Sequence, residues 1–149
     1  MPQRAVLTVT RGPNQDDAIS LDTGSCRLIG RHLSDNETVM IDRDGNRLLD
    51  GQAARILTSH LKDRAPATGV SPVEGFSVNA FERGPDVILA DDSISRAHAM
   101  IFLDTNGLGV IDLASTNGTF INNDRIGSAL AKDGDVLTIG SSELGLQIK

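Results

Sequence analysis

The stretch that decides the fold is residues 86–122, DVILADDSISRAHAMIFLDTNGLGVIDLASTNGTFIN. Short apolar runs alternate in it with polar segments rich in Asp, Ser, Asn and Gly, a pattern typical of brief strands joined by tight turns. The runs that predict strands are Asp86–Leu89, His98–Asp104, Leu108–Leu113 and Thr119–Ile121. Thr105-Asn106-Gly107, which separates the second run from the third, predicts a hairpin turn.

Both ends of the chain continue this pattern. The remaining runs that predict strands are Ala5–Thr10, Ala18–Leu21, Cys26–Gly30, Val136–Ile139 and Leu144–Ile148. Gly, Asn and Asp turns separate them. Many short strands at this spacing favour a β-sandwich, so the sequence predicts an all-β fold.

The middle of the chain, residues 33–85, has a different character. Val39–Ile41 and Arg47–Leu49 flank a polar turn and predict a small hairpin. Asp50 is a suitable N-cap for an amphipathic helix that runs to about Lys62. The sequence therefore predicts one domain over 1–149, with 33–85 inserted as a packed hairpin and helix between the third and fourth strands.

Composition and charge exclude several classes of protein. The chain has 149 residues, a net charge of −6, and 3% aromatic residues with no Trp or Tyr. An acidic chain repels a phosphate backbone, and it has few aromatic rings on which bases could stack, so nucleic acid is not an expected partner. Any anion that binds must be held by a few well-placed donors.

Cysteine usage and hydropathy predict an intracellular environment. The single cysteine, Cys26, cannot form an internal disulfide, and its place in a strand-like run predicts a buried thiol. The N-terminal sequence has no apolar stretch of signal-peptide length, and no run approaches the length of a membrane span. We therefore expect a cytoplasmic protein with no membrane partner.

Catalytic and metal-binding signatures are incomplete. Ser95 and His98 are spaced like a nucleophile and its base, but there is no Gly-x-Ser-x-Gly elbow and nothing marks an orienting carboxylate. Asp42–Gly45 is similar to a calcium loop but lacks acidic ligands at the first and last positions. Three scattered His and one Cys make no metal cluster. We predict that the chain is not an enzyme and needs no cofactor or metal.

Three motifs occur in an order that resembles one known family. They are Gly30-Arg31 after a strand, Ser95-Arg96-Ala97-His98 after another, and Ser115-Thr116-Asn117-Gly118-Thr119, with Asp133-Gly134-Asp135 further on. Together they resemble the forkhead-associated (FHA) domain over residues 1–32 and 86–149. The resemblance implies a β-sandwich of about eleven strands whose loops at one end hold a phosphothreonine peptide.

The resemblance also implies which residues contact the ligand: Arg31, Ser95, Arg96, Thr116 and Asn117. A phosphate with a charge of about −1.5 to −2 requires charge-assisted donors, which a guanidinium fork, hydroxyl groups and loop N–H groups supply. In the family pattern Arg31 bonds the phosphate or the neighbouring peptide backbone, Ser95 donates to a phosphate oxygen, and Thr116 is a second donor on the phosphate side. Asn117 bonds the peptide main chain and fixes its register. Arg96 is at a variable position of the family. Its side chain has two alternative roles, contact with the phosphate or a solvated charge, and the sequence does not choose between them.

Other motif positions are expected to be structural. In the family His98 ties the loops together and Gly30 permits a close backbone approach, while Gly118 belongs to a turn. Asn122 matches an Asn-Gly turn of the family, but here Asn123 replaces the Gly. Asn tolerates positive φ, so this departure is mild.

The resemblance implies a phosphothreonine-dependent binding module that recruits a partner phosphorylated by a Ser/Thr kinase, or the kinase itself. The alternative is a phosphate-independent interaction scaffold on the same fold, which would use the sandwich faces or the insertion. Binding of one peptide with and without its phosphate separates the two hypotheses.

Overall fold

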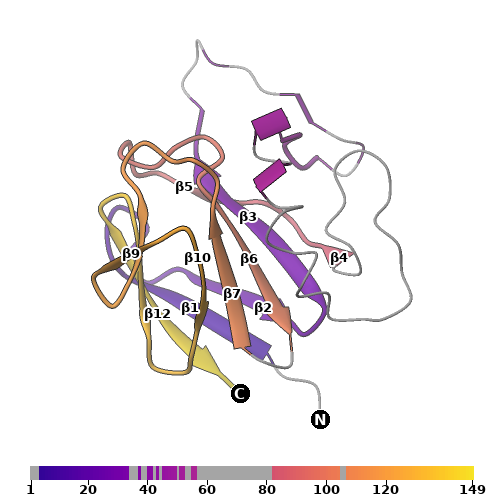
Figure 1. Cartoon of the computed structure of the whole chain (residues 1–149). Helices are drawn as coiled ribbons and strands as arrows, with labels where there is room; N and C mark the ends of the chain where they lie inside the picture. The colour runs from indigo at the N-terminus through magenta and orange to yellow at the C-terminus, as the bar shows by residue number, and fades with distance from the viewer. Residues whose placement is uncertain are drawn as a thin grey trace.

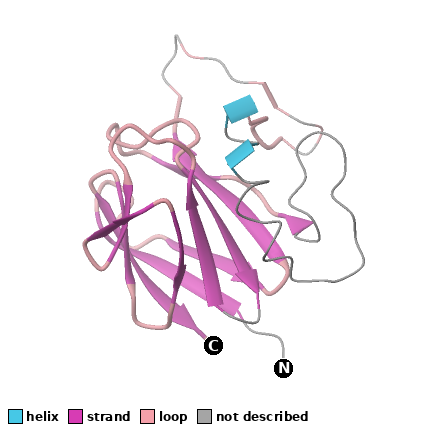
Figure 2. Ribbon diagram, viewed as in Figure 1, coloured by secondary structure: helices cyan, strands magenta, loops and turns pink. Residues whose placement is uncertain are grey.

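The computed structural model describes residues 4–33, 37, 40–41, 43, 45–49, 51–52, 55–56, 82–104 and 107–149. These residues form two β-sheets packed face to face, as Figure 1 shows. Strands and loops make up the body of the molecule, and the helical residues 51–52 and 55–56 lie beside the sheet that contains β3 (Figure 2). The structure is therefore the predicted all-β sandwich.

One sheet has the strand order β2-β1-β12-β11-β8-β9, and each neighbouring pair is antiparallel. Its strands are β1 (Arg4–Arg11), β2 (Ala18–Asp22), β8 (Thr119–Ile121), β9 (Asp124–Ile126), β11 (Val136–Ile139) and β12 (Ser142–Ile148). Strands from the two ends of the chain pair with each other here, because β1 lies beside β12.

The other sheet has the order β10-β7-β6-β3-β4, and β5 also pairs with β3. Its strands are β3 (Ser25–Arg31), β4 (Glu82–Arg83), β5 (Val87–Leu89), β6 (Ala99–Asp104), β7 (Gly107–Asp112) and β10 (Ser128–Ala131). The short strands β4 and β5 run parallel to β3, while the other pairs are antiparallel. The chain leaves the sheet after β3 and returns at β4.

The strands predicted outside residues 33–85 all occur, β8 and β11 with the predicted ends and the others with ends shifted by one or two residues. The predicted hairpin runs Val39–Ile41 and Arg47–Leu49 form no named strand among the described residues. Three observed strands were not predicted, namely β4, β9 and β10. Asp124-Arg125-Ile126 is mostly polar and Ser128-Ala129-Leu130-Ala131 has no β-branched or aromatic residue, so neither carries a strand signal. These strands exist because neighbouring strands offer them backbone hydrogen bonds, which local composition does not reveal.

The main core fills the space between the two sheets with aliphatic side chains, as the scarcity of aromatic residues requires. A second apolar cluster, which includes Leu28, Met100 and Phe102, belongs to the sheet that contains β3. Leu49 and Ile56, from the segment between β3 and β4, pack against this second cluster. All six residues of β6 are buried, because apolar side chains cover both of its faces.

Polar contacts also attach this segment to the sheet. Ile41 and Arg47 form a β-bridge, and the Leu48 N–H donates to the Met40 carbonyl at 2.8 Å, within the hairpin that the sequence predicts. Buried Arg47 donates its N–H to Asp86 Oδ2 at 2.7 Å, and Arg83 donates to the Arg47 carbonyl at 2.8 Å. Most of the predicted helix Asp50–Lys62 lies outside the described residues.

Burial also affects the protonation of the single thiol. Cys26 is fully buried in β3, and this burial raises the pKa of its thiol to about 12.

Among the described residues, no helix has both the length and the apolar character needed to cross a membrane.

Close packing on the second apolar cluster gives a test of the fold. A Cβ added to Gly109 would lie 2.2 Å from Cζ of Phe102, whereas one added to Gly127 meets nothing within 4 Å. We expect Gly109→Ala to lower the free energy of unfolding by about 1–3 kcal/mol through overpacking. Urea unfolding of Gly109→Ala, with Gly127→Ala as the matched control, measures this; equal stability of the two variants would contradict the packing.

Candidate functional site

The loops that follow β5 and β7 lie at the end of the sandwich opposite the two termini, beside the end of β3 (Figure 1). They line a pocket of about 840 Å³ together with residues of the segment between β3 and β4. All five predicted ligand-binding residues, Arg31, Ser95, Arg96, Thr116 and Asn117, line this pocket. The structure thus brings together residues from three separate parts of the sequence.

Arg31 ends β3, and its guanidinium is held on several sides. Its Nε–H donates to the Ile94 carbonyl at 3.1 Å, and Nη1 donates to the His32 carbonyl at 3.3 Å. The remaining contacts go to Glu37, with 2.9 Å from Nη1 to Oε1 and 2.7 Å from Nη2 to Oε2. The hydrogen bond to Glu37 raises the pKa of Arg31, so the group stays charged.

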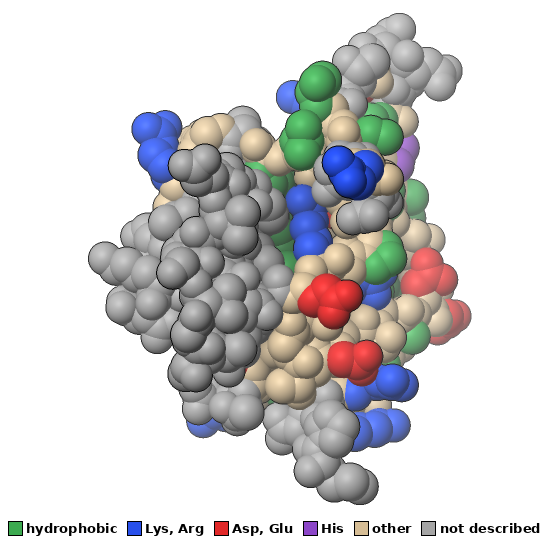
Figure 3. Space-filling model, turned by 90° about the vertical axis from the view of Figure 1, so that its right-hand side faces the viewer, with side chains coloured by type: hydrophobic (Ala, Val, Ile, Leu, Met, Phe, Trp, Pro, Cys, Tyr) green, Lys and Arg blue, Asp and Glu red, His purple; other side chains and the backbone are tan. Residues whose placement is uncertain are grey.

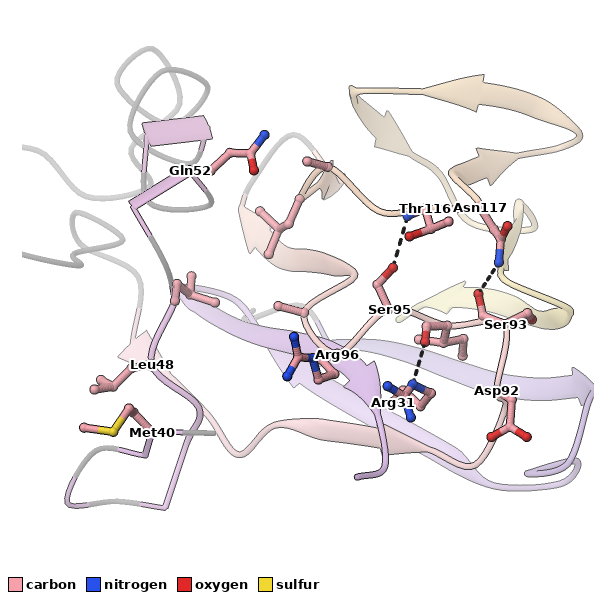
Figure 4. A pocket seen from close by; sticks show the side chains of 15 residues that line it. Arg31, Met40, Leu48, Gln52, Asp92, Ser93, Ser95, Arg96, Thr116 and Asn117 are labelled. Carbon is pink, nitrogen blue, oxygen red and sulfur yellow. Dashed lines mark hydrogen bonds between the residues drawn. The ribbon is translucent and has the colours of Figure 1, made fainter. Parts of the chain in front are cut away.

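Ser95 and Thr116 are bonded to each other across the pocket. The Thr116 N–H donates to Ser95 Oγ at 3.1 Å, so the two loops meet at this point (Figure 4). The Ser95 hydroxyl oxygen is the acceptor in this bond, at the point where the two loops meet beside the pocket. Its own proton can therefore donate to a ligand oxygen.

Asn117 and Arg96 flank this pair. Asn117 donates from Nδ2 to the Ser93 carbonyl at 2.7 Å, a second link between the same two loops. Arg96 is exposed on the side of the pocket that faces Met40 and Leu48 (Figure 4). Its Nε lies 3.8 Å from Oε2 of Glu37, so Arg96 adds a second positive charge to the pocket.

His98 connects the loop that follows β5 to the loop that follows β7. Its Nδ1 accepts the Ser95 N–H at 3.0 Å, which leaves Nε2 as the donor to the Gly118 carbonyl at 2.9 Å. Both ring nitrogens are therefore bonded to backbone groups, and the ring is fully buried. In this arrangement His98 does not act as a base toward Ser95 Oγ, and its two hydrogen bonds link the loop that carries Ser95 to the loop that carries Gly118.

Gly30 provides a close backbone approach. A Cβ at this position would lie 2.1 Å from the Arg96 carbonyl and 3.0 Å from Nη1 of Arg47. That space is used by Arg47, whose Nη1 donates to the Arg96 carbonyl at 2.7 Å. Sequence reasoning missed Arg47 as a support of the pocket, because nothing local signals a contact between residues 47 and 96.

Two carboxylates, which the sequence did not single out, shape the loops. Asp91 accepts from the Ser93 hydroxyl, from the Ser142 hydroxyl at 2.8 Å and from the Ser141 N–H at 2.9 Å. Burial alone would raise the pKa of Asp91, but these hydrogen bonds hold it below its usual value. Asp91 therefore fixes one loop as a charged acceptor and is not a charge on the pocket rim.

Asp112 plays the same part in the other loop. It accepts from the hydroxyl groups of Ser115 and Thr119, the second at 2.7 Å. Gly118 has a φ of +87°, a value that favours glycine, and its N–H donates to Ser115 Oγ at 3.0 Å. These contacts shape the turn that presents Thr116 and Asn117.

Asn122 lies away from the pocket lining and supports a separate turn. It donates from Nδ2 to Asp135 at 3.0 Å and accepts the Val136 N–H at 2.9 Å. Asn122 and Asn123 have φ values of +49° and +72°, so Asn123 adopts the left-handed conformation that the missing Gly would have provided.

Charged side chains of both signs are interspersed on the face shown in Figure 3, and they do not form one basic field. Within the described residues, no group of three or more His, Cys, Asp or Glu side chains is placed to hold a metal ion. The donors that line the pocket are hydroxyl, amide and guanidinium groups, which are able to bind an anion.

The state of His98 gives a test of the site. Its burial lowers the pKa of the imidazole, so the folded protein keeps the ring neutral while the unfolded chain takes up a proton near its ordinary pKa of about 6.5. Stability is then lost as pH falls below about 6.5, with a slope of at most about 1.4 kcal/mol per pH unit from this group.

We expect NMR titration to show that the pKa of the His98 ring in the folded protein lies below its ordinary value of about 6.5. We also expect His98→Gln to show a flatter decline of unfolding free energy between pH of about 6.5 and about 5.5 than the unsubstituted protein. A folded-state pKa at or above the ordinary value would contradict the assigned hydrogen bonds.

The FHA domain family model matches residues 81–140 of the chain. Glycogen accumulation regulator GarA of Mycobacterium tuberculosis is 34% identical over 83 residues, which is 54% of this chain and 51% of GarA. An ABC transporter ATP-binding/permease protein of the same organism is 34% identical over 95 residues, 62% of this chain and 11% of the transporter. The aligned region thus spans about half the length of GarA.

Solved structures share the fold over nearly the whole chain. The FhaA FHA domain, complexed with the intracellular domain of Rv3910, has a TM-score of 0.52 and 20% identity, covering 96% of this chain and 99% of that one. Mycobacterium tuberculosis EmbR, in complex with a low-affinity phosphopeptide, has a TM-score of 0.52 and 19% identity, covering 97% of this chain and 24% of EmbR. At these identities the likeness concerns the fold.

Proposed function

Because this chain carries an FHA domain, we propose that it is a phosphothreonine-dependent binding module that recruits a protein phosphorylated by a Ser/Thr kinase. The chain would act by binding, in the cytoplasm, and not by catalysis. Two structural relatives support the proposal, since one is complexed with an intracellular domain and the other with a phosphopeptide.

The observation that carries the proposal is the meeting of Arg31, Ser95 and Thr116 in one pocket. A guanidinium and two hydroxyl groups form a donor set suited to a phosphate, which has a charge near −2 and three acceptor oxygens. Asn117 has an amide at the rim that can bond the main chain of an extended peptide. In an acidic protein such a concentrated donor set is needed, because the overall field repels anions.

Phosphate dependence is tested with a degenerate phosphothreonine peptide library and then by calorimetry on one selected peptide. Loss of one hydrogen-bonding partner of a charged group costs about 1.5–3 kcal/mol, so Ser95→Ala and Arg31→Lys should each weaken binding by about tenfold or more. Lysine keeps the charge of Arg31 and removes its bidentate fork. Arg31 also bonds the Ile94 carbonyl, so melting temperatures must accompany both measurements.

The phosphoserine form of the same peptide should bind about fourfold more weakly, because one buried methyl group contributes about 0.8 kcal/mol. Equal binding of the phosphorylated and unphosphorylated peptides would overturn the proposal and favour the phosphate-independent scaffold.

The pocket also has an apolar side that would contact residues flanking the phosphothreonine. Met40 and Leu48 line it and are 74% and 49% exposed, which is unusual for apolar side chains of this size. They belong to the segment between β3 and β4 and lie on the far side of Arg96 from Ser95 and Thr116 (Figure 4). A peptide that places its phosphate on the donor set and extends in this direction would bury an apolar side chain against them.

The same library should therefore be enriched in Leu, Ile, Val or Met at one position that flanks the phosphothreonine. Leu48→Ser should reduce that enrichment, because it removes apolar contact area from the pocket. Ile88→Ser is the matched control, since Ile88 is 41% exposed and lies outside the pocket lining. Unchanged selection with Leu48→Ser, or an equal loss with Ile88→Ser, would contradict a role for this side of the pocket.

A further inference from the structure

The contact between Arg31 and Glu37 has a consequence for the pocket. Glu37 comes from the segment that follows β3, and its two carboxylate oxygens receive Nη1 and Nη2 of Arg31 at 2.9 and 2.7 Å. The two side chains are 19% and 24% exposed, so water screens this pair less than an ordinary surface ion pair. The paired Nη groups are the same groups that would form a bidentate contact with a phosphate.

Arg31 has few donors to spare while this pair is intact. A guanidinium carries five N–H donors. The Ile94 and His32 carbonyls and the two oxygens of Glu37 take four of them. A phosphate cannot form the bidentate contact until the carboxylate leaves, because both would use the same two Nη groups.

The charges around Glu37 explain why a carboxylate is stable there. Arg96 lies 3.8 Å from it, and buried Arg47 is near enough to feel its charge. Burial lowers the pKa of Arg47, and the charges of Arg31 and Arg96 lower it further, while Asp86 and Glu37 oppose this. Glu37 thus offsets the repulsion among three neighbouring guanidinium groups, two of which, those of Arg31 and Arg96, line the pocket.

We infer that Glu37 is a built-in competitor for the phosphate site, which sets the affinity of the pocket by occupying the Arg31 fork. This inference rests on the proposed function. The phosphate of a ligand displaces Glu37 because it brings more negative charge and a third oxygen. A carboxylate of an unphosphorylated partner has the same charge and the same number of oxygens as Glu37. Acidic segments therefore gain little binding free energy from contact with Arg31.

The energetic consequence follows from competition. If the ligand binds only when Arg31 is open, the apparent dissociation constant equals the intrinsic constant divided by the open fraction. Removing the carboxylate raises that fraction toward unity. Every ligand that needs Arg31 would then bind more tightly by the same factor, so weak acidic ligands would reach measurable affinity.

The test compares Glu37→Gln with Asp92→Asn by calorimetry, using a short phosphothreonine peptide flanked by alanines and its glutamate-substituted form. Asp92 also lines the pocket and its charge also acts on Arg31, but its side chain is 90% exposed and takes no part in the fork. Asp92→Asn therefore removes the same unit of charge without opening Arg31, and melting temperatures check that both variants fold.

We expect Glu37→Gln to bind the phosphothreonine peptide about three- to tenfold more tightly than the unsubstituted protein, and Asp92→Asn by less than about twofold. The glutamate peptide should gain by the same factor. Equal or weaker binding by Glu37→Gln would overturn the inference, as would an equal gain from Asp92→Asn. Failure of the phosphothreonine peptide to bind any of the three proteins would overturn the proposed function, and this inference with it.

Discussion

The pocket depends on one buried imidazole. His98 accepts the Ser95 N–H and donates to the Gly118 carbonyl, so one ring fixes both loops that carry hydroxyl and amide donors. The two bonds require a neutral ring with its proton on Nε2, and burial keeps the ring in that state. Asp91 and Asp112 complete the arrangement, because each satisfies several donors within one loop. Most of the polar groups near the pocket therefore support the backbone and are not directed at a ligand.

The segment between β3 and β4 takes part in the site as well as in the fold. Leu49 and Ile56 pack against the second apolar cluster, which lets β6 be buried on both faces. Arg47 reaches past Gly30 to bond the loop that carries Ser95 and Arg96. Met40, Leu48 and Glu37 then bring apolar surface and a negative charge to the pocket. The described residues of this segment thus contribute both to the packing of the sheet and to the lining of the pocket.

Much of the fold could be predicted from sequence, since periodic apolar runs and turn residues act over short distances. The strands β8 and β11 begin and end at the residues that the sequence predicted. Ile41 and Arg47 pair across the turn for which the sequence predicted a hairpin. The strands β4, β9 and β10 could not be predicted, because they are short, Ile126 is their one β-branched residue, and they form strands only beside a partner. Arg31 was predicted to contact a phosphate, and the structure shows it mostly shielded and bonded to Ile94 and Glu37.

The sequence by itself determined the sandwich and the order of its motifs, because backbone propensity, turn chemistry and residue type are local properties. The family resemblance also predicted that Arg31, Ser95, Arg96, Thr116 and Asn117 form one site, although they come from distant segments. Only the tertiary structure decided what surrounds that group. The bond from Arg47 to the Arg96 carbonyl joins residues 49 positions apart, and no sequence pattern signals the contact between Glu37 and Arg31. Such contacts depend on how the segment after β3 folds back onto the sheet, which no local pattern specifies.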